Sequence, residues 1–524
     1  MIRTRFAPSP TGYVHIGSLR TALFNYLFTR KNKGVMVLRI EDTDQKRLVE
    51  GAVENLISTL KMLGLDYDEG PIAGGQLGPY VQSERTEIYR KYANELIEKG
   101  KAYRCFCTEE RLEEMRTRQM ARKAAPMYDR TCLKLSEEEI KAKIDAGIPF
   151  VIRQKIPHDQ TVEFTDLIRG KVRFETNTID DQVLLKSDKF PTYHLAVVVD
   201  DHLMQITHVI RGEDWLPSTP KHILLYRDFG WETPQFAHMP LILNADKSKL
   251  SKRQNDVSVE SYLNKGYSKE ALINFVAFLG WHPGEDMESE ILDLSDLIEK
   301  FSIEKVHKSG AVFDLEKLNW FNFQWQKKKH LEKLTEIAKS IEPDYQTELN
   351  QKNETVFKFS KPENKIRFIQ SRAELLYDIC KNHLPQTWIA EKDKLLKALI
   401  TVEEKILRKP AEVADYIRFY FDPKEAPLEL MLNAKMKVDQ SIAKTGLENS
   451  INSLSDLDNY EDMDAIQQQL IGLVQKLGLK NGQLLWPIRV ALSGEEYSPG
   501  TFDLIWVLGK TETIARIKKA LQTL

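Results

Sequence analysis

The first forty residues decide the fold, and they read IRTRF (2–6), APSPTGYVHIG (7–17), SLRTALFNYLFTRK (18–31) and, after Gly34, VMVLRI (35–40). The first and last of these segments have the residue types of short buried strands. The segment before Gly34 repeats apolar residues at helical spacing, and the glycine ends that pattern. The order strand, loop, helix, strand predicts a βαβ unit that opens a parallel sheet.

Two polar segments, the APSPTGYVHIG loop and EDTD (41–44), follow the predicted strands at the edge where parallel sheets bind ligands. The loop ends at a helix N-terminus, whose free N–H groups and dipole favour phosphate. Gly17 leaves room for a base or ribose, and His15 can donate a hydrogen bond to a phosphate oxygen. A turn followed by an ordinary structural histidine is the alternative for a motif this short.

The later chain changes character several times. A second helix is expected over 83–99, with Ser83 as its N-cap. Residues 105–190 mix cysteines, a charged helix and short strand-like runs, which predicts a domain inserted into the sheet. The run HLAVVVDD (194–201) is expected to return to the sheet as a buried parallel strand, and the chain beyond residue 255 to be helical. The predicted fold is an α/β Rossmann-type domain with an inserted α+β domain, followed by an all-α C-terminal half.

Length and composition exclude several classes of protein. The chain has 524 residues, 42% hydrophobic and 29% charged, which is too long for a single small binding module. Its 75 Lys and Arg nearly cancel its 77 Asp and Glu, which excludes a uniformly basic nucleic-acid coat. Four cysteines cannot form a disulfide framework, and the sequence lacks a signal-peptide core and a membrane-spanning apolar run. We therefore expect a cytoplasmic protein.

A second basic motif, KSKLSKR (247–253), lies between the predicted sheet and the helical half. Lysines suit the transient charge of a leaving polyphosphate, because they are compact point charges on flexible stems. Taken alone, such a run of charges is usually a solvated surface. Together with the His15 loop, it favours nucleotide chemistry.

The HIG sequence at 15–17 and the KLSKR sequence at 249–253 resemble the HIGH and KMSKS signatures of class I aminoacyl-tRNA synthetases. The C-terminal segment GQLLWPIRVALSGEEYSPGTFDLIWVLGK is similar to the helical anticodon-binding end of one family in that class. The chain has Ser18 where the signature ends in His, so only His15 is carried over. Segments spread over residues 1–325 resemble the same family, the bacterial-type glutamyl-tRNA synthetases: FAPSPTGYVHIGSLRTALFNYLF, VLRIEDTD, GPYVQSERTEIY, KGKAYRCFC, FPTYHLAVVVDD, HVIRGEDW, LSKR and FDLEKLNWFN.

The resemblance implies a ligase that joins glutamate to ATP as glutamyl-adenylate and passes the glutamyl group to the 3′-terminal adenosine of its tRNA. It implies catalytic roles for His15, Lys249 and Lys252, and ATP binding by His15, Gly17 and Lys252. The α-carboxylate of glutamate attacks the α-phosphate directly, so these residues would position groups and stabilise charge. Mg²⁺ would arrive with the ATP phosphates.

The resemblance also implies a glutamate pocket made of Arg5, Ser9, Glu41, Tyr193 and Arg211. Glu41 can pair with the ammonium of the amino acid. Arg5 and Arg211, with the Tyr193 hydroxyl, can bind the side-chain carboxylate. Without the motifs, an ordinary ion pair would be the simpler interpretation of Arg5 or Glu41.

Cys105, Cys107 and Cys132 bring three thiols into one segment, without a fourth Cys or His. Family members that hold zinc here usually show a later Cys-x-His pair, and this chain has Lys134 at the His position. Tyr128 is the candidate fourth ligand, which would give one structural zinc in the inserted domain. A metal-free site of buried reduced thiols is the equal alternative on ligand count.

The resemblance also implies the partners and the domains of the chain. The partners of the protein would be glutamate tRNA, glutamate and ATP, and the chain would act as a monomer. The C-terminal part mixes basic and aromatic residues, which suits phosphate contacts and base stacking, although an ordinary helical bundle would carry them too. The expected domains are the first half of the catalytic domain (1–104), an inserted acceptor-stem-binding domain (105–192), the second half of the catalytic domain (193–254), a helical stem-contact domain (255–330) and a helical anticodon-binding domain (331–524).

Other classes of protein fit parts of the same pattern. A glutaminyl-tRNA synthetase is disfavoured by the two pocket arginines and by EDTD. A nucleotidylyltransferase also places an H-x-G loop on a doubly wound sheet, but such enzymes are generally shorter. A truncated relative that glutamylates a modified tRNA base lacks the C-terminal domain. A tRNA-binding protein without activity would require degenerate signatures, and the signatures here are intact.

Overall fold

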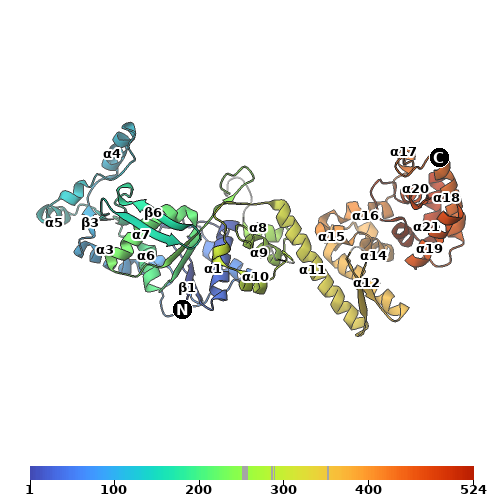
Figure 1. Cartoon of the computed structure of the whole chain (residues 1–524), viewed down its shortest axis with the longest axis horizontal. Helices are drawn as coiled ribbons and strands as arrows, with labels where there is room; N and C mark the ends of the chain where they lie inside the picture. Colours follow the sequence, from blue (N-terminus) through green and yellow to red (C-terminus); the bar gives the residue numbers. More distant parts are fainter. Residues whose placement is uncertain (251–257, 285–286, 288, 351–352) are drawn as a thin grey trace. The chain divides into compact units, whose positions relative to one another are not determined.

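The computed structural model describes residues 1–250, 258–284, 287, 289–350 and 353–524. The chain forms two compact units, Met1–Asn322 and Phe323–Leu524, each with its own hydrophobic core. In Figure 1 the strands and helices of the first unit run from blue to yellow-green, and the helices of the second run from yellow to red.

The predicted βαβ unit is confirmed. β1 (Arg3–Phe6) pairs in parallel with β2 (Val35–Leu38), and α1 (Ile16–Lys31) connects the two strands. The apolar residues of α1 are buried, as expected of a helix that covers a sheet. The backbone N–H of Thr207 donates to the carbonyl of Arg3 at 3.0 Å, so the strand that begins at His208 starts beside β1.

A second sheet carries the residues that come later in the chain. β8 (His208–Gly212) and β9 (Gln235–Met239) run parallel, and β5 (Thr161–Asp166) joins β9 in parallel through Asp166 opposite Phe236. Because β5 comes from the predicted insertion, this pairing places Asp166 close to the strand that carries Arg211. The strand order is β6 (Gly170–Glu175), β5 (Thr161–Asp166), β9 (Gln235–Met239) and β8 (His208–Gly212).

One predicted strand is wrong. HLAVVVDD (194–201) lies in α6 (Tyr193–Leu203), a helix that packs against α3 (Thr86–Glu98) and α7 (Thr219–Phe229). Residues 195–201 are all buried, and periodicity cannot tell a helix from a strand when every face is covered. The predicted cap Ser83 is also wrong, because it lies in a 3₁₀ segment and α3 begins at Thr86.

The remaining elements of the first unit surround these sheets. β3 (Ala102–Cys105), β4 (Val151–Gln154) and β7 (Val183–Leu185) form an antiparallel sheet in the predicted insertion. β10 (Ile242–Leu243) pairs in parallel with β11 (Ala311–Val312). The helices are α2 (Ala52–Leu63), α4 (Glu109–Ala121), α5 (Glu137–Asp145), α8 (Val259–Asn264), α9 (Lys269–Ala277) and α10 (Leu294–Lys300).

The second unit is helical, as predicted, with one short addition. A hairpin of β12 (Gln346–Leu349) and β13 (Thr355–Lys358) follows α11 (Leu315–Ile341). In the described part of the chain, no helix is both long and apolar enough to cross a membrane. The longer helices are α12 (Pro362–Cys380), α14 (Lys392–Ile400), α16 (Val413–Phe421), α18 (Gln440–Ser455), α19 (Met463–Lys476), α20 (Asn481–Ser493) and α21 (Thr501–Leu521).

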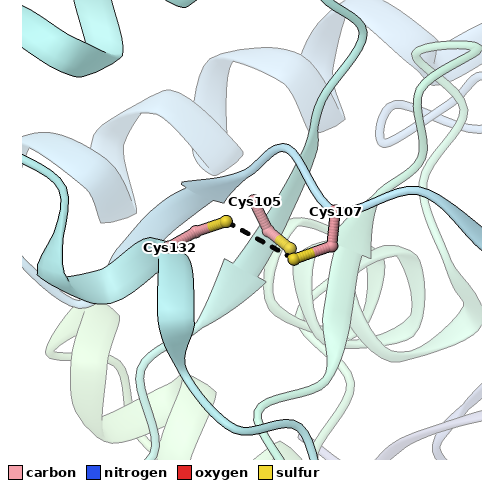
Figure 2. Close-up of side chains that lie close together, drawn as sticks. All are labelled: Cys105, Cys107 and Cys132. Atoms are coloured by element: carbon pink, nitrogen blue, oxygen red, sulfur yellow. Dashed lines mark hydrogen bonds between the residues drawn. The ribbon is translucent and has the colours of Figure 1, made fainter. Parts of the chain in front are cut away.

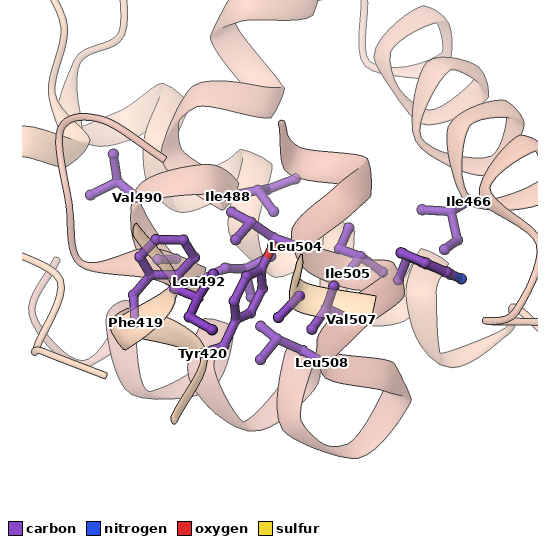
Figure 3. Packing of buried hydrophobic residues seen from close by; sticks show 14 of the residues in the cluster. Phe419, Tyr420, Ile466, Ile488, Val490, Leu492, Leu504, Ile505, Val507 and Leu508 are labelled. Carbon is purple, nitrogen blue, oxygen red and sulfur yellow. The ribbon is translucent and has the colours of Figure 1, made fainter. Parts of the chain in front are cut away.

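A buried arginine, Arg516, lies among apolar side chains in the core of the second unit. Figure 3 shows the apolar part, with Tyr420, Leu492 and Leu504 among its members. The Arg516 guanidinium donates to the carbonyls of Phe419 at 2.7 Å, Leu492 at 2.6 Å and Tyr420 at 2.9 Å. These carbonyls lie in the last turns of α16 and α20, where backbone acceptors lack partners within the helix. A cation therefore satisfies two helix ends at once.

We expect Gly34→Ala to destabilise the first unit. A Cβ at Gly34 would lie 2.4 Å from the carbonyl oxygen of Ile2, a backbone atom that already accepts from Val35 N. The clash should cost about 1–3 kcal/mol and lower the midpoint of thermal unfolding. Gly472→Ala is the control, because its Cβ meets nothing within 4 Å in α19 and should gain about 1 kcal/mol of helix propensity. Equal stability of wild type and Gly34→Ala would contradict the packing described here.

Candidate active site

A pocket of about 950 Å³ lies beside the N-terminus of α1 and the ends of β1 and β8. It collects residues from widely separated parts of the chain. Lys252, the one predicted site residue of this pocket outside the described residues, cannot be assigned to it. The other predicted ATP and glutamate residues all line the pocket: Arg5, Ser9, His15, Gly17, Glu41, Tyr193, Arg211 and Lys249.

His15 caps α1, the helix that follows the APSPTGYVHIG loop. The backbone N–H of Ser18 donates to Nδ1 of His15 at 3.2 Å, so the ring proton belongs on Nε2. The Ser18 hydroxyl lies 3.0 Å from that Nε2, which lets the ring donate either to Ser18 or to a ligand. A Cβ at Gly17 would lie 3.0 Å from the His15 ring. Gly17 therefore makes room for this ring as well as for a ligand.

A cluster of buried charges lies beneath the pocket, and we call it the buried network. The Arg39 guanidinium contacts Asp201 at 2.8 Å and Glu41 at 3.0 Å, and Arg5 Nε contacts Asp201 at 3.2 Å. Burial opposes these charges, yet the carboxylates raise the pKa of Arg39 well above its usual value, and the guanidinium groups lower that of Asp201. Burial raises the pKa of Glu41, which Arg39 and Arg5 only partly offset.

Asp200 extends the buried network toward α3. Its carboxylate accepts from Arg85 Nε at 2.7 Å, Gln82 Nε2 at 2.8 Å and the Tyr89 hydroxyl at 2.8 Å. We complete the definition of the network with Arg85 and Asp200, both almost fully buried. The sequence prediction missed Arg39, Arg85 and both aspartates of α6. For Arg39 and the two aspartates the signal was charge placed directly after an apolar run, whereas Arg85 follows three polar residues and gave no such signal.

Arg211 differs from the arginines of the buried network in its surroundings. It donates to the Tyr193 hydroxyl at 3.1 Å, Thr219 Oγ1 at 3.0 Å and His238 Nε2 at 3.1 Å. Among the described residues, it makes no ion pair, and all its hydrogen-bond acceptors are neutral. Burial lowers its pKa, and burial with the Arg211 charge holds the pKa of His222 well below its usual value. The arrangement leaves a buried positive charge for an anionic ligand.

The mouth of the pocket carries exposed cations. Lys249 lies 2.8 Å from Asp214, and both side chains are about half exposed. Arg47 and Lys186 also line the pocket. Cations on long, partly exposed side chains suit a polyphosphate better than a small buried anion.

The predicted metal residues come together in the inserted part of the first unit. Figure 2 shows Cys105, Cys107 and Cys132, whose sulfurs all lie within 4.8 Å of one another. The Tyr128 hydroxyl lies 3.3 Å from the sulfurs of Cys105 and Cys107. The 3.6 Å between Cys107 and Cys132 Sγ is close to the ~3.8 Å expected between thiolates on one tetrahedral zinc. These four side chains fit a zinc ion in number and spacing.

Comparison with known proteins identifies the class. A family model described as the catalytic domain of class I tRNA synthetases (E and Q) matches residues 1–320, and an anticodon binding domain model matches residues 336–521. The chain therefore belongs to the class I tRNA synthetases of this E and Q family.

Individual relatives are more specific than the family model. The glutamate–tRNA ligase of Chloroherpeton thalassium is 47% identical, covering 100% of this chain and 98% of the relative. A crystal structure of a glutamate tRNA ligase from Elizabethkingia meningosepticum in complex with its amino acid shares 35% identity, with a TM-score of 0.76 over 100% of this chain and 99% of that one. The synthetase structure from Elizabethkingia anophelis has a TM-score of 0.75 over the full length of both chains. The predicted resemblance to glutamyl-tRNA synthetases is confirmed.

We expect Asp200→Asn to destabilise the first unit strongly, because it leaves Arg85 buried without its carboxylate. Removing one partner of a buried ion pair typically costs about 3–5 kcal/mol. The control is Glu87→Gln on the neighbouring helix α3, which removes an exposed partner of Arg90 and should cost less than about 1 kcal/mol. Thermal unfolding followed by circular dichroism measures both, and similar midpoints for the two variants would contradict the structural role given to Asp200.

Proposed function

We propose that this chain activates glutamate with ATP and transfers the glutamyl group to the 3′-terminal adenosine of glutamate tRNA. The observation that carries the proposal is the charge of the pocket. In the buried network three guanidinium groups face three carboxylates, whereas Arg211 has neutral partners. The buried network and Arg211 together thus carry one excess positive charge. Glutamate, with one ammonium and two carboxylates, carries one excess negative charge.

The contacts of the network suggest how the amino acid is held. Arg211 and the Tyr193 hydroxyl would bind its side-chain carboxylate, joined by Arg5, whose contacts with Asp201 use only Nε. Arg39 contacts Glu41 through Oε1 alone, which leaves Oε2 for the ammonium. Ser9 lines the same pocket and offers a hydroxyl at its more exposed side.

Activation needs no nucleophile from the protein. An α-carboxylate oxygen of glutamate bonds to the α-phosphorus of ATP while the bond to pyrophosphate breaks, and pyrophosphate leaves. His15 Nε2 and Lys249, with Lys252, would stabilise the phosphate charge, and Mg²⁺ would be bound mainly by the phosphates. In the second step a ribose hydroxyl of the tRNA attacks the glutamyl carbonyl and AMP leaves.

The second unit supports tRNA as the partner, because its match is to an anticodon binding domain. One chain then carries both the activating pocket and the tRNA-binding helices, and we propose that it acts as a monomer in the cytoplasm. The alternatives that the sequence left open are less favourable. Glutamine is neutral overall and would leave Arg211 unmatched. A nucleotidylyltransferase or a truncated tRNA-modifying relative would not need residues 336–521.

We expect Arg211→Ala to lower kcat/KM for glutamate, because the substrate loses a charge-assisted partner. The loss corresponds to several kcal/mol of transition-state stabilisation. Activity with glutamine should fall much less or rise, because the variant removes the mismatch between the Arg211 guanidinium and the glutamine amide. A polar mismatch of this kind discriminates between two substrates by about 10⁴-fold. The measurement is pyrophosphate exchange with each amino acid, with glutamate tRNA present.

Arg227→Ala provides the matched control, since Arg227 is an exposed arginine on α7 that does not line the pocket. It should leave both substrates unaffected. An equal loss for glutamate and glutamine in Arg211→Ala would remove Arg211 as the specificity residue. A wild-type chain that exchanges no pyrophosphate with glutamate would refute the proposed function itself.

We also propose that Cys105, Cys107, Tyr128 and Cys132 hold one structural zinc. Hydrogen bonding from Tyr128 and the charge of Arg153 lower the pKa of Cys105 despite its burial, whereas burial raises that of Cys107 to about 11. The support is the spacing of the four ligand atoms. A bound zinc would fix β3 to the loop that carries Tyr128 and so order this part of the first unit.

Protein purified without added metal should contain about one zinc per chain by elemental analysis. Cys132→Ser should lose that zinc, whereas Cys380→Ser should keep it, because Cys380 is a buried thiol of the second unit. Absence of zinc from the wild-type chain would favour the alternative of reduced thiols without metal.

A further inference from the structure

Two residues that do not line the pocket are connected to Arg211 by hydrogen bonds. His238 lies opposite Arg211 in the pairing of β8 with β9, and Asp166 lies at the end of the neighbouring β5. Both side chains are completely buried. Arg211 Nε lies 3.1 Å from His238 Nε2, and His238 Nδ1 lies 2.6 Å from Asp166 Oδ2. The three residues form one hydrogen-bonded line that ends at the pocket.

The direction of each hydrogen bond in this line is fixed by chemistry. A guanidinium Nε can only donate, so His238 must accept at Nε2 and carry its proton at Nδ1. That proton is donated to Asp166. The opposite tautomer, or a doubly protonated ring, would place an N–H of His238 against the N–H of Arg211. Burial lowers the pKa of His238, which also keeps the ring neutral.

Asp166 is suited to select this tautomer because both its oxygens must accept. Oδ1 receives the backbone N–H groups of Ile168 at 3.0 Å and Arg169 at 2.8 Å. The backbone N–H of His238 reaches both oxygens at 3.2 Å, and the ring donates to Oδ2. An amide at this position must place its NH₂ against some of these donors. The mismatch is smallest when the NH₂ group takes the place of Oδ2. Nδ1 of His238 would then have to accept from that NH₂ group, and the ring proton would move to Nε2, where it faces Arg211.

We propose that Asp166 and His238 are positioning residues that set the specificity for glutamate by holding Arg211 in line with the substrate side-chain carboxylate. The inference rests on the proposed function. Arg211 keeps its whole charge for the substrate, because His238 orients it without neutralising it. A carboxylate needs a guanidinium in a defined plane, whereas an amide depends less on that plane. The predicted insertion thus contributes to amino-acid choice through Asp166, which does not itself line the pocket.

The test uses the full-length chain and pyrophosphate exchange with glutamate tRNA present. Asp166→Asn should raise KM for glutamate about 10- to 100-fold, the effect of misaligning one buried charged hydrogen bond. KM for ATP should change by less than about two-fold, and the preference for glutamate over glutamine should narrow. Asp228→Asn is the matched control, because this carboxylate accepts from Gln154, is also mostly buried and does not line the pocket.

Two substitutions of His238 separate positioning from packing. In His238→Gln the amide oxygen can reach the place of Nε2 and still accept from Arg211. This variant should therefore keep most of the wild-type preference for glutamate over glutamine. In His238→Asn the shorter side chain can keep the contact with Asp166 but cannot reach Arg211, so the preference should be lost. Thermal unfolding of each variant shows how much stability it retains.

The outcomes divide cleanly. A wild-type chain inactive with glutamate would refute the proposed function and not this inference. An active wild type whose KM for glutamate is unchanged in Asp166→Asn and His238→Asn would overturn the inference. Equal loss of kcat in all three variants, with no change in the ratio of glutamate to glutamine, would assign Asp166 and His238 a structural role only and would also overturn it.

Discussion

The burial of Arg39 is the constraint on which the pocket depends. This guanidinium is completely excluded from solvent at the end of β2, and removing an ion from water costs several kcal/mol unless it is paired and hydrogen-bonded. Its partners are Glu41 from the same segment and the adjacent carboxylates of α6, with Asp201 at 2.8 Å. The sheet and α6 must therefore meet in one register. That register also brings Arg5 and Glu41 to the pocket floor.

Some parts of the fold could be predicted from local sequence, and others depend on pairing between distant residues. The βαβ unit follows from local patterns, because one helical face and two short strands are visible in the sequence itself. The change of HLAVVVDD from expected strand to helix is a tertiary effect. Its apolar residues are covered on every side, and its two aspartates pair with arginines more than 100 residues away, so no local period distinguishes the two forms. The short hairpin at 346–358 also gave no signal above its helical surroundings.

Much of the candidate site could be predicted, because the family motifs contain many of the residues that line the pocket. What the sequence could not supply is the difference between Arg5 and Arg211. Both are buried pocket arginines, but only the first has a carboxylate partner, and that partner lies on a helix 196 residues away. The sequence prediction also missed His238 and Asp166, because local sequence does not show which distant residues meet in the fold. They stand at the ends of separate strands, and only the parallel pairing of β5, β9 and β8 aligns them with Arg211.

The two ends of the pocket face different physical tasks, and their charges differ accordingly. The buried end fixes its guanidinium groups during folding, so that a glutamate bound as proposed meets a preorganised field and little reorganisation is required of the protein. Lys249 at the mouth is about half exposed and pairs with an equally exposed Asp214. Water and salt screen such a pair, so its lysine can exchange Asp214 for phosphate at small cost. In the proposed function, selection therefore belongs to the buried end, while the exposed end can follow the charge of a departing pyrophosphate.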